Sequence, residues 1–150
     1  MVLKRESIIA RLQKLEEVLG RLREKETVSL EEYRRDISLQ WFVERGLELA
    51  SSLVLDTGNH ILAGAFRIAV DEYEKILEEL RRQGVISEQL YRDLRGLGGF
   101  RNILVHGYME LDHELVYAHY KKALQVFPGF IGEVTAWLEG QSGAGNTGVD

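Results

Sequence analysis

The sequence of 150 residues lacks cysteine, has a single proline and contains no long apolar run. The absence of cysteine excludes a disulfide framework and thiolate metal sites, and it fits a reducing compartment. No apolar stretch approaches the roughly 20 residues that a membrane span needs. The charged start Met1–Glu6 also lacks the apolar stretch of a signal peptide. We therefore expect a cytoplasmic protein without a membrane partner.

Other absences narrow the possible activities. The sequence has no P-loop, no His-Glu-x-x-His zinc pair and no Gly-x-Ser-x-Gly elbow. Its 19 Lys and Arg against 24 Asp and Glu give a net charge of −5, and a total of that sign argues against a nucleic-acid partner. The length and the 45% hydrophobic content suit one globular domain.

Apolar residues recur at helical spacing along most of the chain, which predicts an all-α fold, an antiparallel bundle of about five helices. We expect a single domain over 1–139 and a disordered, glycine-rich tail over 140–150. The first expected helix covers 4–26, and the second is long, running from the capping box Ser29–Glu32 to an end between residues 55 and 63. A third helix is expected from a box-like start at 71–74 to Gly84, and a fourth begins at the cap Ser87. The last helix is expected to begin at Asp112 and to kink at Pro128.

Two polar features allow a functional and a structural interpretation. The run Gly96–Gly99 before a helix either holds a phosphate on backbone N–H groups or marks a bend or close helix approach, and we favour the second. Asp56 and His60 continue a polar helical stripe from Glu48 and Ser52. A hydrogen-bonded or surface pair is the better interpretation for them, so we expect no metal site.

The remaining histidines outside the segment described next are His113 and His119. Neither has a clear partner in the sequence. We interpret both as surface residues.

The segment 100–108 concentrates side chains suited to phosphodiester chemistry. The planar charged fork of Arg101 fits phosphate oxygens, and the imidazole of His106 can accept and donate a proton. Asn102 and His106 share one helical face, and Arg101 and Tyr108 nearly coincide if the helix continues. From the residues alone, a capped helix end with solvated arginines is an equally good interpretation.

The charge around this segment differs from the total. Residues 80–108 hold five arginines against two acidic residues, a net charge of +3. Arg92, Arg95 and Arg101 are therefore candidate RNA-binding residues, since a basic patch is what an RNA backbone needs.

The pattern Arg101-x4-His106-x-Tyr108 resembles that of the HEPN superfamily, and specifically of the HepT-like toxins. The residues Phe100–His106, the stretch from Glu44 to His60 and the segment Gly84–Ile86 that precedes the motif are also similar to that family. The likeness covers roughly residues 30–135.

The resemblance implies a homodimer in which two such motifs face each other and cleave RNA without metal or cofactor, with no DNA substrate expected. It implies catalytic roles for Arg101 and His106, with Asn102 and Tyr108 in support. It further implies neutralisation by an MntA-like nucleotidyltransferase antitoxin that adds AMP to Tyr108.

Two other functional classes compete with the ribonuclease toxin. One is a non-catalytic HEPN-like module that binds a nucleotide or partners a nucleotidyltransferase. The other is a structural helix-pairing protein that uses the apolar stripe from Ile8 to Leu22. The intact Arg-x4-His-x-Tyr pattern favours the toxin over both.

Overall fold

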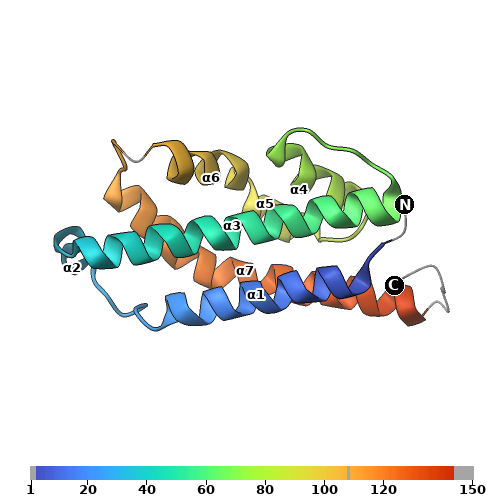
Figure 1. The fold of residues 1–150 in the computed structure, drawn as a ribbon, viewed down its shortest axis with the longest axis horizontal. Coiled ribbons are helices and arrows are strands. Elements are labelled where there is room, and N and C mark those ends of the chain that lie inside the picture. Colours follow the sequence, from blue (N-terminus) through green and yellow to red (C-terminus); the bar gives the residue numbers. More distant parts are fainter. Residues whose placement is uncertain (1–2, 108, 144–150) are drawn as a thin grey trace.

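The computed structural model describes residues 3–107 and 109–143 (Figure 1). In these residues the chain forms helices and no strand, which confirms the all-α prediction. The seven helices of the described residues are α1 (Arg5–Arg23), α2 (Leu30–Arg35), α3 (Ile37–Phe66), α4 (Tyr73–Arg82), α5 (Glu88–Leu94), α6 (Leu97–His106) and α7 (His113–Gly143).

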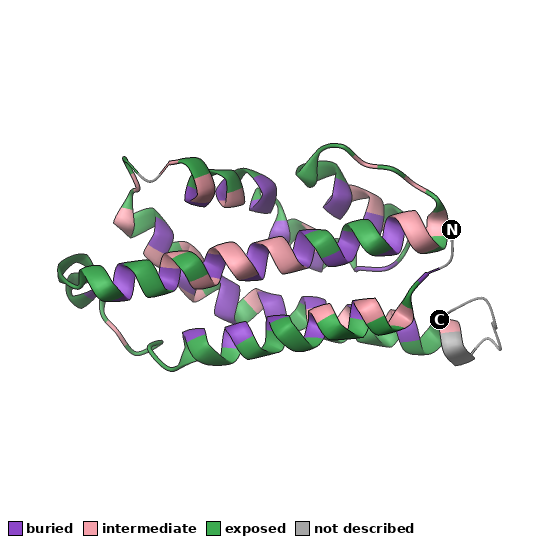
Figure 2. Cartoon of the chain, in the orientation of Figure 1, coloured by how far each residue is buried: buried purple, intermediate pink, exposed green. Residues whose placement is uncertain are grey.

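The three long helices form the body of the bundle. α1 and α3 lie side by side and run in opposite directions, and α7 packs against both (Figure 1). The shorter helices α4 and α6 lie along the other side of α3, and α5 packs against α4 and α7. The buried faces of all these helices turn toward a common core (Figure 2), in which Leu15, Leu47 and Phe130 are essentially inaccessible to water. Burial of this apolar surface is the main source of stability.

The prediction of one long helix from Ser29 is wrong in one respect, because the chain forms two helices there, α2 and α3. The capping box of Ser29 and Glu32 is present but begins only the short α2. Asp36 then starts α3 with its carboxylate, which accepts a hydrogen bond from the backbone N–H of Leu39. The Gln40 amide stabilises the break by donating to two carbonyl groups at the end of α2.

α3 also extends beyond the expected end between residues 55 and 63. It continues to Phe66 and ends at Arg67, a non-glycine residue with the left-handed φ of 56°. When a helix ends in the left-handed conformation, the residue there is usually glycine. The sequence therefore carries no ordinary stop signal where this helix ends.

The last helix begins as expected, because the Asp112 carboxylate accepts hydrogen bonds from the backbone N–H groups of the first turn. α7 continues through Pro128 instead of ending there, and it reaches Gly143. Residues 140–143 are thus helical where disorder was predicted, and 144–150 lie outside the described residues. The kink at Pro128 stays a prediction. Across the described helices, none combines the length and apolar content of a membrane span.

Candidate functional site

The Arg-His motif lies on α6. Phe100 and Leu104 bury one side of this helix, and Asn102 and His106 are exposed on another, as their spacing of four residues predicts. The helix ends at His106, where the backbone N–H of Gly107 donates to a carbonyl group one turn back. The shared helical face predicted for Arg101 and Tyr108 depended on the helix continuing beyond His106, and it stays a prediction. Tyr108 itself lies outside the described residues.

Arg101 is half-buried and held by residues from two other helices. Its Nε donates a hydrogen bond of 3.0 Å to the Ser52 hydroxyl on α3. Its guanidinium lies over the ring of Tyr73 on α4, with Cζ 5.1 Å from the ring centroid. Among the described residues, no hydrogen bond or ion pair engages Nη1 or Nη2 of Arg101. These two nitrogens are the pair that would grip a phosphate.

The N-terminus of α6 binds a carboxylate of the chain itself. The backbone N–H groups of Gly96 and Gly98 donate to the two carboxylate oxygens of Glu74, at 3.1 and 2.9 Å. The phosphate interpretation of Gly96–Gly99 is therefore wrong, and the close-approach interpretation is confirmed. The box-like start expected at 71–74 is wrong as well, because Glu74 caps α6 and not its own helix.

Gly98 and Gly99 offer a matched pair of substitutions. A Cβ at Gly98 would lie 2.8 Å from Cβ of Tyr73, whereas a Cβ at Gly99 meets nothing within 4 Å. We expect Gly98→Ala to destabilise the protein by about 1–3 kcal/mol, since the helices must separate. We expect Gly99→Ala to stabilise it by about 0.5–1 kcal/mol through helix propensity. Urea unfolding measures both, and equal effects would contradict the packing described here.

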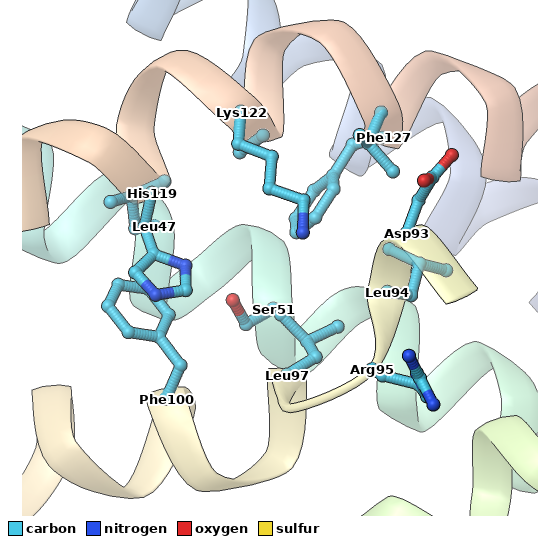
Figure 3. Close-up of a pocket in the computed structure, with 12 residues that line it drawn as sticks. Leu47, Ser51, Asp93, Leu94, Arg95, Leu97, Phe100, His119, Lys122 and Phe127 are labelled. Carbon is cyan, nitrogen blue, oxygen red and sulfur yellow. The ribbon is translucent and has the colours of Figure 1, made fainter. Parts of the chain in front are cut away.

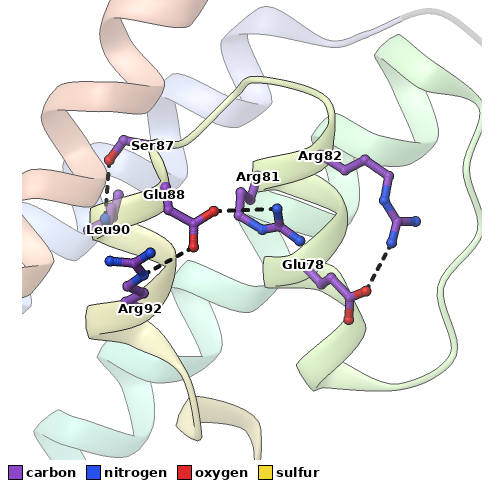
Figure 4. A network of polar contacts seen from close by, with 7 residues as sticks. All are labelled: Glu78, Arg81, Arg82, Ser87, Glu88, Leu90 and Arg92. Carbon is purple, nitrogen blue, oxygen red and sulfur yellow. Dashed lines mark hydrogen bonds and ion pairs between the residues drawn. The ribbon is translucent and has the colours of Figure 1, made fainter.

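Ion pairs engage three of the five arginines in residues 80–108, so the net charge of +3 overstates the positive charge available to RNA. Arg81 and Arg92 both pair with Glu88, and Arg82 pairs with Glu78 (Figure 4). Arg82 also pairs with Glu79. Glu78 and Glu79 both lie before residue 80, so neither was included in the net charge of +3 for residues 80–108. Arg95 and Arg101 are the two of the five arginines without an ion pair to any described residue. The predicted contact of Arg92 with RNA therefore competes with an exposed ion pair, which is weak and screened by salt.

A small cavity lies between α3, α7 and the segment from α5 to α6 (Figure 3). The His119 ring lies beside it and stacks on Phe100, with centroids 3.8 Å apart and planes at 16°. Burial lowers the pKa of His119, and the charge of Lys122 lowers it further. The surface interpretation of His119 is therefore wrong. The cavity measures about 30 Å³, far below the roughly 300–1,000 Å³ of typical small-molecule sites, so its size suits water rather than a nucleotide.

His113 and His60 also have identifiable surroundings. His113 keeps 40% of its side chain exposed, so it lies at the surface as predicted, but it has neighbours that the sequence did not show. Its Nδ1 lies 4.0 Å from the Glu44 carboxylate, and its ring meets Tyr33 edge-on. Burial raises the pKa of Glu44, and His113 opposes that shift. Burial lowers the pKa of His60, whereas the charge of Asp56 raises it. The described residues hold no group of three or more potential metal ligands.

Sequence reasoning missed Ser52, Tyr73 and Glu74 as neighbours of the motif. Ser52 belongs to the polar stripe on α3, which was its only signal. The contact of Ser52 with Arg101 spans 49 positions, and those of Glu74 span 22 and 24. Helical periodicity gives no information on contacts between residues so far apart in the sequence.

Known proteins provide independent comparisons. The family model described as ribonuclease HepT-like matches residues 8–134. A tRNA nuclease HepT from Aphanizomenon flos-aquae is 27% identical over 132 residues, which cover 87% of this chain and 89% of the relative.

Two solved structures share the fold. A tri-AMPylated HEPN toxin of Shewanella oneidensis in complex with MNT antitoxin matches with a TM-score of 0.76 and 24% identity, over 86% of this chain and 96% of the other. A toxin–antitoxin structure with AMP-PNP matches with a TM-score of 0.78 and 23% identity, over 88% and 99%.

Proposed function

Because this chain belongs to the ribonuclease HepT-like family, we propose that it is the toxin of a toxin–antitoxin pair and cleaves RNA without a metal ion. The observation that carries the proposal is the state of the motif on α6. Arg101 is held in place with Nη1 and Nη2 unengaged by described residues, and His106 is exposed at the end of the same helix. A phosphodiester lying across the helix can meet both side chains.

In the proposed reaction, His106 transfers protons and Arg101 stabilises charge. One imidazole removes the proton of the attacking hydroxyl, which belongs to the ribose 2′-OH or to water. A second group returns a proton to the leaving 5′-oxygen as the P–O bond breaks. Arg101 binds the phosphate oxygens, where negative charge increases in the transition state. The exposed amide of Asn102 supports the site by donating to a phosphate or by orienting His106.

The need for two proton-transfer groups supports a homodimer, since the motif contains a single histidine. Large apolar side chains are exposed on α3, on α6 and just after α6. We propose that four of them, Ile37, Trp41, Ile103 and Met109, form one interaction surface, which we call the apolar face. Trp41 is 65% exposed, and large apolar side chains in such a setting mark an interaction surface. Pairing of two copies through this face would bring two α6 helices together.

Regulation by a nucleotidyltransferase antitoxin completes the proposal. The Shewanella oneidensis toxin carries AMP groups and is bound to its antitoxin. In this chain we propose that an MntA-like antitoxin transfers AMP to Tyr108, two positions after His106. The added phosphate would repel RNA from the site, and its bulk would block access. A cytoplasmic location is part of this proposal, since the RNA substrate and the antitoxin would both be present there.

The proposal is tested with purified protein and total RNA in EDTA, beside a chain that carries Arg101→Ala and His106→Ala together. We expect cleavage by the wild type alone. Equal products from both chains would exclude the catalytic assignment and favour a non-catalytic nucleotide-binding module. Co-expression with an MntA-like nucleotidyltransferase, followed by mass spectrometry, should show AMP on Tyr108 and none after Tyr108→Phe.

A further inference from the structure

We propose that Ser52 and Tyr73 are positioning residues that fix the guanidinium of Arg101 for phosphate binding. This inference rests on the proposed function, because it assigns a role within the same site. Ser52 comes from α3 and Tyr73 from the first turn of α4. Neither residue belongs to the Arg-His motif.

The contact with Ser52 sets the direction of the guanidinium within its own plane. Nε carries a single N–H, and that group is directed at the Ser52 hydroxyl. Because the guanidinium is rigid and planar, fixing Nε also fixes where Nη1 and Nη2 lie. The hydroxyl thus engages the nitrogen nearest the side-chain stem and leaves the two terminal nitrogens for a ligand.

The contact with Tyr73 sets the tilt of that plane. Cζ of Arg101 lies 5.1 Å from the centroid of the Tyr73 ring, a distance at which the ring attracts the cation. One contact restricts rotation within the plane and the other restricts rotation out of it. Together they hold the side chain in one orientation before the substrate arrives.

The residue after Tyr73 anchors the helix that bears Arg101. The Glu74 carboxylate accepts hydrogen bonds from the backbone N–H groups of Gly96 and Gly98, at the N-terminus of α6. The first turn of α4 therefore controls both the position of α6 and the orientation of one of its side chains. An arginine ordered in this way loses less rotamer freedom when it binds phosphate than a free one does.

Ser52 is tested by the rate of RNA cleavage. We expect Ser52→Ala to lower kcat/KM by about tenfold, and Ser52→Thr to retain most of the rate because it keeps a hydroxyl. Ser38→Ala is the matched control, since it removes an exposed serine from the first turn of the same helix. In an Arg101→Lys background, Ser52→Ala should cause no further loss. A full tenfold loss in that background would show that Ser52 acts on the structure in general and would overturn the proposal.

Tyr73 is tested by separating its ring from its hydroxyl. We expect Tyr73→Leu to lower kcat/KM by about tenfold and Tyr73→Phe to keep the rate, because the ring makes the contact. Tyr91→Leu is the matched control, since Tyr91 lies beneath Arg81 in a similar pair at 4.9 Å. Equal losses for Tyr73→Leu and Tyr91→Leu would contradict a role specific to Arg101.

A measurement without substrate separates this inference from the proposed function. The Arg101 Nε–H resonance, assigned by its loss in Arg101→Lys, should exchange slowly with water in the wild type. We expect faster exchange in Ser52→Ala and a return toward the wild-type value in Ser52→Thr. Unchanged exchange in Ser52→Ala would overturn the positioning role even if RNA is cleaved. Faster exchange in a protein that cleaves no RNA would leave the contact established and reject the ribonuclease.

Discussion

His106→Ala is expected to slow RNA cleavage by about 100- to 10,000-fold, the range that loss of a general acid or base usually causes. His106 is exposed at the end of α6 and packs in no core, so its removal should leave the fold intact. Single-turnover cleavage of a defined RNA, beside circular dichroism, measures the two effects separately. A rate within threefold of the wild type would exclude His106 from the chemistry.

Arg101→Ala is expected to cause a loss of similar size for a different reason. Removal of a charged donor that stabilises the transition state costs roughly 100- to 1,000-fold in known enzymes. Arg101→Lys keeps the charge but loses both the planar fork and the contact with Ser52, so it should restore little. Arg35→Ala is the control, since Arg35 is an exposed arginine at the end of α2, paired with Glu31. Equal losses for Arg101→Ala and Arg35→Ala would indicate a general loss of charge.

Trp41→Asp is expected to dissociate the proposed homodimer and, with it, the composite site. A charge placed in the centre of an apolar interface opposes association. The resulting monomer holds one His106 in place of two, so cleavage should fall by about the 100- to 10,000-fold expected for a missing acid or base. Light scattering coupled to size-exclusion chromatography gives the mass, and the RNA assay gives the rate on the same sample.

Ile9→Asp is the control for that experiment, because Ile9 is an exposed isoleucine on α1, outside the apolar face. It introduces the same charge into a different surface, and we expect neither the mass nor the rate to change. A monomeric wild type that cleaves RNA would refute the composite site. A dimeric and active Trp41→Asp would place the interface elsewhere.

The sequence predicted those features that depend on neighbouring residues. The capping box at Ser29, the cap at Ser87 and the start at Asp112 all have local hydrogen-bond signals, and all three are present. The break at Asp36 was missed because the apolar periodicity passes through it. The end at Arg67 was missed because its left-handed backbone occurs without glycine.

The candidate site was predictable only in part. The spacing of Asn102 and His106 correctly placed both on one exposed side of α6. The surroundings of Arg101 come from α3 and α4 and depend on how the helices pack. The net charge of residues 80–108 was also a poor guide to the free positive charge there, since Arg82 pairs with Glu78 and Glu79, which lie outside that segment. Packing decides which charges meet.

The bond between Glu74 and the start of α6 has a consequence for the variation of this sequence among its relatives. Gly98 is required by the nearness of Tyr73, and the backbone N–H groups of Gly96 and Gly98 donate to the Glu74 carboxylate there. Position 74 and the glycine run should therefore change together. Relatives that keep both glycines should keep an acidic residue at position 74, and those with a bulkier residue at 98 should show a different start to α4. Such paired change would identify the anchor of the motif helix from sequences alone.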